Sequence, residues 1–206
     1  MASLPSLAQT HTVPVDEKAH AVERYLALAA AVGATLPGPP TFDLPAGDRP
    51  TERLPEGPFV VLHPFSRGEG KSLSPGAVVA FCRAMDCPVV IVGRTDKAPG
   101  DLPANATNLL NKTSLTELLW LLRHATFVVS VDSGPMHLAA AATDHLLAIH
   151  TWSDPCRVGP YRPGAHVWKA RNFFPALDPA SSNVPSVEPT PDDAETMARR
   201  VREKLA

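Results

Sequence analysis

The apolar residues in the central part of the chain follow two different periods. Short, mainly apolar runs are typical of strands buried on both faces of a parallel sheet, and they lie at residues 59–63, 88–93, 108–110, 127–131 and 145–151. Between them, apolar residues recur every three or four positions, which predicts helices over residues 74–85, 114–124 and 135–143. This alternation predicts an α/β fold with a mainly parallel sheet, in which the run 127–131 is central because it is apolar on both faces.

Residues that favour helix starts support this assignment. Ser74 precedes Pro75, and Ser114 is followed three residues later by Glu117, as in a capping box. Two more helices, which we expect to pack outside the sheet, are predicted at residues 17–33 and 192–204.

Proline divides the rest of the chain. Many of the 23 prolines cluster at residues 36–58 and 175–191, which predicts linkers or irregular wraps, and residues 156–189 are expected to be rich in loops. We therefore expect three parts: an extended or disordered segment at 1–15, a helix and proline-rich linker at 16–58, and one Rossmann-like domain at 59–206.

Composition excludes several classes of protein. The net charge of −2 over 206 residues gives no basic surplus for nucleic acid. The three cysteines, Cys82, Cys87 and Cys156, form neither a disulfide framework nor a zinc motif, so we expect reduced thiols and a cytoplasmic protein. No apolar run approaches the roughly 20 residues that span a bilayer, and no signal peptide is evident. Peripheral docking on a membrane surface stays open.

Ligands of parallel sheets bind beyond the carboxyl ends of the strands, so the loops there are informative. The loop at 63–72 contains two glycines, and Ser66, Arg67 and Lys71 can donate to phosphate oxygens. Its spacing is not that of a P-loop, and a solvated turn is the alternative interpretation. After the next strand, Gly93 leaves room for a flat group, while the nearby Asp96 either accepts from ribose hydroxyls or caps a turn.

The segment 129–141 has the strongest signal. An apolar strand leads into Asp132, Ser133, Gly134 and Pro135, and an alanine-rich helix starts at once. The free N–H groups and dipole of such a helix start form an anion site, and glycine leaves space for a diphosphate. Asp132 either caps the helix or contacts a ligand. His137 is read as a packed helix residue rather than a catalyst, and the turn at 152–161 either completes a cleft or is an ordinary loop.

These loops, taken in order, resemble the C-terminal domain of glycosyltransferase family nine, the bacterial lipopolysaccharide heptosyltransferases. The segments that carry the resemblance are Lys71-Ser72-Leu73-Ser74-Pro75, Val92-Gly93, Asn111-Lys112-Thr113-Ser114-Leu115, Asp132-Ser133-Gly134-Pro135-Met136-His137 and Thr151-Trp152-Ser153-Asp154-Pro155. Leu73 replaces the family's usual tryptophan, Ser72 a basic residue, and Thr151-Trp152 the common Gly-Pro. The resemblance runs from about Phe59 to Tyr161, and the helix at 17–33 is similar to the family's interdomain segment.

The resemblance implies the donor-binding C-terminal half of a two-domain GT-B enzyme, an inverting glycosyltransferase that takes a nucleotide sugar such as ADP-heptose. It implies a diphosphate on Lys71, Ser133 and Gly134, a nucleoside beside Gly93 and Thr113, and no metal or other cofactor. The expected donor-binding residues are Ser66, Lys71, Gly93, Thr113, Asp132, Ser133, Gly134 and Pro135.

The resemblance also implies an acceptor half that holds the general base, and this half has no counterpart before residue 16. We therefore expect a chain that is incomplete alone, with a lipopolysaccharide-like acceptor and a separate acceptor-domain chain as partners. A non-catalytic nucleotide-sugar-binding or scaffold module derived from such an enzyme is the alternative.

Overall fold

The computed structural model describes residues 12–35, 38–96 and 99–206. The chain divides into two units, residues 1–41 and 42–206. The first unit contains helix α1 (Ala21–Ala31), whose first turn is capped by the His20 ring, which accepts from the Val22 amide at 3.2 Å. The helix begins later than predicted because Asp16 closes a separate turn, accepting from the amide of Lys18 on its side chain and from that of Ala19 on its carbonyl. Residues 1–11 of the predicted extended segment lie outside the described residues.

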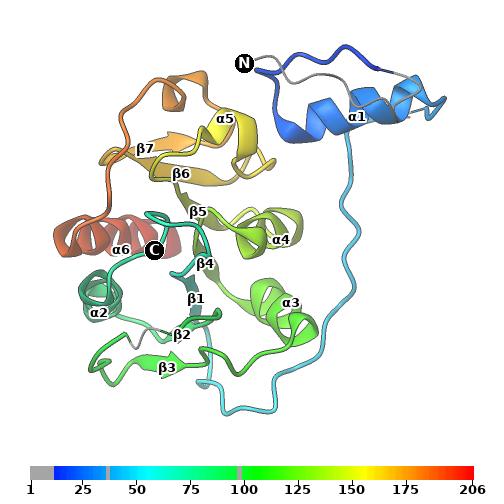
Figure 1. Ribbon diagram of the computed structural model, residues 1–206. Helices are drawn as coiled ribbons and strands as arrows, with labels where there is room; N and C mark the ends of the chain where they lie inside the picture. The colour runs from blue at the N-terminus through cyan, green and yellow to red at the C-terminus, as the bar shows by residue number, and fades with distance from the viewer. Residues whose placement is uncertain (1–11, 36–37, 97–98) are drawn as a thin grey trace. The chain divides into compact units, whose positions relative to one another are not determined.

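The second unit is built on a seven-stranded sheet with the order β3-β2-β1-β4-β5-β6-β7 (Figure 1). The strands are β1 (Val60–His63), β2 (Val89–Ile91), β3 (Ala106–Asn108), β4 (Phe127–Val131), β5 (Leu146–Ile149), β6 (His166–Lys169) and β7 (Asn172–Pro175). All neighbours are parallel except β6 and β7. The prediction of a mainly parallel sheet with 127–131 at its centre is confirmed.

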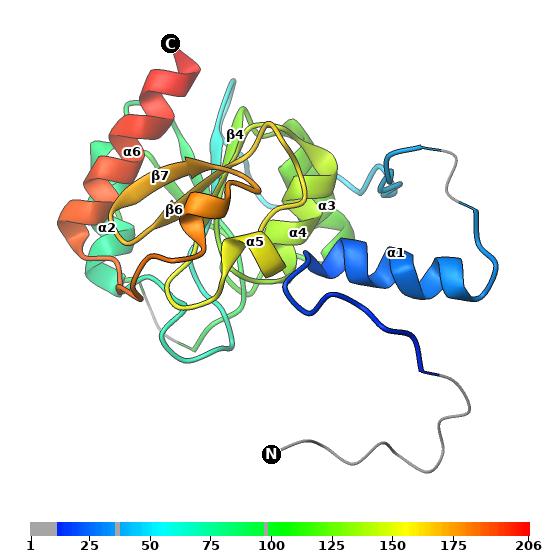
Figure 2. The ribbon, with the colours of Figure 1, turned by 90° about the horizontal axis from the view of Figure 1, so that it is seen from above.

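Helices cover both faces of this sheet. In Figure 2, α2 (Pro75–Ala84) and α6 (Pro191–Leu205) lie on one side, and α3 (Leu115–His124) and α4 (Gly134–Ala142) lie on the other. Successive strand residues point to opposite faces, so Leu62 of β1 joins the core under α2 and α6, while Val61 joins the core under α3 and α4. This two-sided burial explains why the central strands are almost entirely apolar.

The order of the strands reverses at β1. From β1 the chain moves outward through β2 and β3, and then returns through α3 to place β4 on the other side of β1. In open α/β sheets the crevice above such a reversal is where ligands bind. The loops after β1 and β4 contain most of the residues that the sequence predicts for the donor.

The proline-rich segment after residue 41 belongs to the second unit and lies alongside α3 in space. The Arg123 guanidinium donates to the carbonyl of Leu44 at 2.6 Å, and the Thr51 amide donates to the Glu117 carboxylate at 3.3 Å. These bonds satisfy a backbone that forms no regular structure.

The stretch 156–189 is more ordered than predicted. It contains the antiparallel hairpin of β6 and β7, the end of a short helix α5 (Pro155–Val158), and a 3-10 turn at Pro179–Ser181. The two residues that connect β6 to β7, Ala170 and Arg171, have φ angles of 50° and 64°. Turns of this kind usually carry Asn or Gly, so the sequence contains no hairpin signal there.

Strand β3 begins two residues before the predicted run. Leu109 and Leu110, which suggested the strand, lie just after it and pack into the two cores. The Leu109 amide still donates to Ile91 at 2.9 Å, so the chain continues along the sheet edge beyond the strand. Among the described residues, no helix is both long and apolar enough to cross a membrane.

Candidate functional site

A pocket of about 770 Å³ opens at the carboxyl ends of β1, β2 and β4. The structure brings all eight predicted donor-binding residues to its wall, namely Ser66, Lys71, Gly93, Thr113, Asp132, Ser133, Gly134 and Pro135. The remaining wall residues are His63, Phe65, Arg67, Arg94, Ser114, Leu115, Leu118 and His137. Of these, the sequence had assigned phosphate contacts to Arg67 only.

The floor of the pocket is the start of α4, and its backbone donors are not capped by a side chain. Ser133 is the N-cap residue, but its hydroxyl donates instead to the Val131 carbonyl at 3.0 Å. By contrast, Ser74, Ser114 and Thr190 all accept an amide hydrogen at the starts of their helices. The positive end of α4 therefore faces the pocket without a capping oxygen, which suits an anion.

Two glycines shape the pocket. A side chain at Gly134 would meet no atom within 4 Å, so this position borders open space. Gly93 has φ of 131°, and a side chain there would lie 3.2 Å from Nε2 of His63. Gly134 thus leaves room for a ligand, whereas Gly93 is required by its backbone conformation and by the packed histidine.

Lys71 and Asp132 form an ion pair in the pocket. The Lys71 ammonium lies 2.6 Å from Oδ2 of Asp132 and 4.4 Å from the centre of the Trp152 ring. Trp152 is itself held by a hydrogen bond from its indole nitrogen to the Glu69 carbonyl at 3.3 Å. Burial acts to raise the pKa of Asp132, but the hydrogen bonds from Lys71 and Ser153 outweigh it and lower the pKa. Asp132 is therefore a carboxylate at neutral pH.

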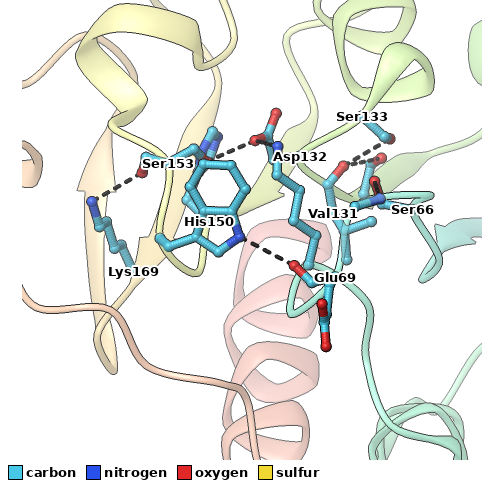
Figure 3. A network of polar contacts seen from close by, with 12 residues as sticks. Ser66, Glu69, Val131, Asp132, Ser133, His150, Ser153 and Lys169 are labelled. Atoms are coloured by element: carbon cyan, nitrogen blue, oxygen red, sulfur yellow. Dashed lines mark hydrogen bonds and ion pairs between the residues drawn. The ribbon is translucent and has the colours of Figure 1, made fainter. Parts of the chain in front are cut away.

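A line of polar groups continues from Asp132 into the protein (Figure 3). Ser153 donates to Oδ2 of Asp132 at 2.7 Å, and Nδ1 of His150 lies 2.9 Å from the same serine oxygen. Lys169 donates from its ammonium to the carbonyl of Ser153 at 3.0 Å. Sequence reasoning found the turn that contains Ser153 but not these contacts, because they join residues that are distant in the sequence.

His63 closes the pocket beside β1. Its Nδ1 lies 3.3 Å from the hydroxyls of both Ser130 and Ser133, and each hydroxyl also donates to the carbonyl of Val131 at 3.0 Å. Since the hydroxyl protons are used in this way, Nδ1 is the donor and His63 is protonated there. Burial lowers the pKa of His63 to about 4, so the ring is neutral at physiological pH. It fixes the Ser133 side chain away from the helix start.

Another part of the pocket wall comes from the start of α3. Ser114 is fully engaged there: its hydroxyl accepts from the Glu117 amide at 3.2 Å and donates to the Glu117 carboxylate at 2.9 Å. Leu115 and Leu118 add apolar surface, and no hydrogen bond to the Thr113 hydroxyl is found among the described residues. This wall suits a flat, partly apolar group with a polar edge.

Several residues considered from the sequence lie elsewhere. Asp96 borders a neighbouring hollow rather than this pocket, and Asp154 caps α5 by accepting from the Cys156 amide at 3.0 Å. Phe65 is 4% exposed and packs in the core under α2. Tyr161 packs edge-on against Phe42, whereas the Trp152 side chain is largely exposed.

Nothing in the described part of the chain groups three or more His, Cys, Asp or Glu side chains as a metal site. The pocket combines one ammonium, two guanidinium groups, an uncapped helix start and a single carboxylate, Asp132. This balance favours a ligand with several negative charges, with a flat group against α3.

Comparison with known protein sequences identifies the family. A model of glycosyltransferase family 9 (heptosyltransferase) matches residues 1–176, a longer stretch than the loops alone suggested. Lipooligosaccharide heptosyltransferase 2 of Haemophilus influenzae is 39% identical over 79 residues, which are 38% of this chain and 22% of the relative.

Solved structures share the fold. The E. coli ADP-heptose lipopolysaccharide heptosyltransferase II aligns with a TM-score of 0.66 and 22% identity, over 94% of this chain and 66% of that one. The E. coli heptosyltransferase WaaC with ADP aligns with a TM-score of 0.61 and 21% identity, over 97% of this chain and 60% of that one. The chain thus spans less than two thirds of the length of these proteins.

Proposed function

The chain belongs to glycosyltransferase family 9, the heptosyltransferase family, and on that premise we propose that residues 59–206 bind the nucleotide-sugar donor of an inverting glycosyl transfer. The observation that carries the proposal is the pocket itself, where Lys71, Gly134 and the uncapped start of α4 face the same space. A diphosphate matches this set, because its oxygens can accept from the ammonium and from backbone amides together.

The nucleoside is proposed to lie between Gly93 and the start of α3. Leu115 and Leu118 offer apolar contact to a flat base, and Thr113 offers a hydroxyl to its edge or to the ribose. A structural neighbour, the E. coli heptosyltransferase WaaC, was solved with ADP. We therefore take an ADP-linked sugar, such as ADP-heptose, as the first donor to test.

The chemistry proposed for this half is stabilisation of the leaving group. As the bond between sugar and diphosphate breaks, negative charge grows on the diphosphate, and Lys71 with the dipole of α4 offsets it. A metal ion is not required for this arrangement. The acceptor, proposed to be a lipopolysaccharide-like glycan at the cytoplasmic side of the inner membrane, would be activated by a base outside the pocket described here.

Titration calorimetry with ADP tests the donor site. Lys71→Ala is expected to weaken binding by about 1–3 kcal/mol, the scale of a charge-assisted hydrogen bond. Gly134→Val is expected to abolish binding while leaving the melting temperature unchanged, because its side chain would enter open pocket space. Lys112→Ala, at an exposed lysine outside the pocket wall, is the matched control. Wild-type affinity in both pocket variants would place the diphosphate elsewhere.

A further inference from the structure

Lys71 lies on the loop after β1, whose backbone is held by hydrogen bonds between Ser66 and Ser72, but these bonds do not fix the lysine side chain. The loop contains Gly68 and Gly70, and Gly70 has φ of 69°. A lysine side chain has four rotatable bonds, so an unrestrained Lys71 would lose much conformational entropy on meeting a ligand. Its ammonium is restrained in this structure by Asp132, which the first turn after β4 holds in a buried position.

Asp132 is in turn restrained by Ser153. Both Lys71 and Ser153 donate to the same oxygen, Oδ2, at 2.6 and 2.7 Å. Ser153 is 6% exposed, and its backbone is fixed independently by Lys169, whose ammonium donates to its carbonyl at 3.0 Å. The position of Asp132 therefore depends on a residue that does not line the pocket.

His150 is the last residue in this line of contacts, and the direction of donation along the line follows from its hydrogen bond with Ser153. Because the Ser153 hydroxyl donates to Asp132, the serine oxygen must accept from Nδ1 of His150, which lies 2.9 Å away. The Nε2 atom of His150 is buried and has no hydrogen-bond partner among the described residues. A proton on Nδ1 leaves Nε2 as a bare lone pair, which avoids burying an unpaired N–H donor.

We propose that Ser153 and His150 are positioning residues of the donor site, which hold Asp132 so that it keeps the Lys71 ammonium in place for the diphosphate. The inference rests on the proposed function. Its physical basis is preorganisation: fixing the lysine before binding removes part of the entropy that binding would otherwise cost. Neither residue touches the ligand in this scheme.

Calorimetry with two ligands separates positioning from a general structural effect. Ser153→Ala is expected to weaken ADP binding about three- to tenfold, the effect of one hydrogen bond, and to leave adenosine binding unchanged because adenosine lacks phosphate. Ser153→Thr retains the hydroxyl and is expected to restore the affinity for ADP. In a Lys71→Met background, Ser153→Ala is expected to have no further effect on ADP, because the group being positioned is absent.

The histidine is tested with a matched pair of variants and by NMR. His150→Asn retains a donor near the position of Nδ1 and is expected to bind ADP as the wild type does, while His150→Phe is expected to resemble Ser153→Ala. The ¹⁵N shifts of His150 in the wild type are expected to show the Nδ1–H tautomer. Melting curves confirm that each variant is folded.

The two proposals fail in different ways. If the wild type binds no ADP, the proposed function is overturned. The positioning role alone is overturned if the wild type binds ADP and Ser153→Ala binds ADP equally well. It is also overturned if Ser153→Ala loses as much affinity for adenosine as for ADP. An Nε2–H tautomer of His150 would also contradict it.

Discussion

The two buried histidines near the pocket, His63 and His150, make the stability of the second unit depend on pH. Burial lowers the pKa of His63 and of His150 to about 4, compared with about 6.5 in an unfolded chain. Between these values the unfolded chain binds more protons than the folded one. The free energy of unfolding is therefore complete above about pH 6.5 and decreases as the pH falls towards 4.

The variant His63→Asn is expected to flatten this dependence. In the wild type, each histidine is expected to lower the free energy of unfolding by roughly 2 kcal/mol between pH 7 and pH 5. The variant has one such histidine fewer, so its free energy of unfolding should decrease by about 2 kcal/mol less over the same pH range. Urea unfolding at both pH values measures the difference. His145→Asn, at an exposed histidine, is the control, and an equal pH dependence in wild type and His63→Asn would show that His63 is not buried as described.

Residues that form the pocket could be predicted from the sequence to the extent that they lie at strand ends. Lys71, Gly93 and Gly134 follow apolar runs, and the edge of a parallel sheet brings such positions together. The contact of Ser153 with Asp132 could not be predicted, because it depends on side-chain rotamers at the ends of β4 and β5.

At the scale of elements, the start of α3 has two neighbouring residues with different tasks. Ser114 closes a capping box with Glu117, while no hydrogen bond to the Thr113 hydroxyl is found in the described ranges. Ser114→Ala is expected to lower the free energy of unfolding by about 1 kcal/mol, the usual value of such a cap.

Thr113→Val is the matched comparison for Ser114→Ala, since both change a hydroxyl at the pocket wall. It is expected to weaken ADP binding with little effect on unfolding, whereas Ser114→Ala should mainly affect unfolding. Urea unfolding and calorimetry on both variants give the two measurements. If Thr113→Val mainly affected unfolding and Ser114→Ala mainly affected ADP binding, the roles assigned here to the two hydroxyls would be wrong.

Elements with local signals were predicted, and those without them were missed. The helices that begin after Ser74, Ser114 and Thr190 were found because their caps can be recognised in the sequence. The hairpin of β6 and β7 was missed because Ala170 and Arg171 adopt positive φ angles without the residues that usually favour them. The pairing of the two strands, a hydrogen bond from the Asn172 side chain to the Ala170 carbonyl and an ion pair between Arg171 and Asp193 hold that turn in place.

At the scale of the whole molecule, the single carboxylate of the pocket limits what the chain can do. Asp132 accepts from both Lys71 and Ser153 and is a poor candidate for a base that removes a proton from an acceptor. We expect the purified 206-residue chain to bind ADP but to transfer no sugar from ADP-heptose to a lipopolysaccharide acceptor, as measured by mass spectrometry of the acceptor. Robust transfer without another protein would mean that a base is present and that the chain is a complete catalyst.

The packing of α6 on α2 bears on how this protein is made in the cell. Helix α2 directly follows the loop that contains Lys71, and its buried face is completed by Ala194, Met197, Ala198 and Val201 of α6. A ribosome releases α6 only after every other element of the unit has emerged. The packing of α2 is therefore completed late in translation, and we expect the loop that contains Lys71 to gain its full support only after α6 has left the exit tunnel and docked.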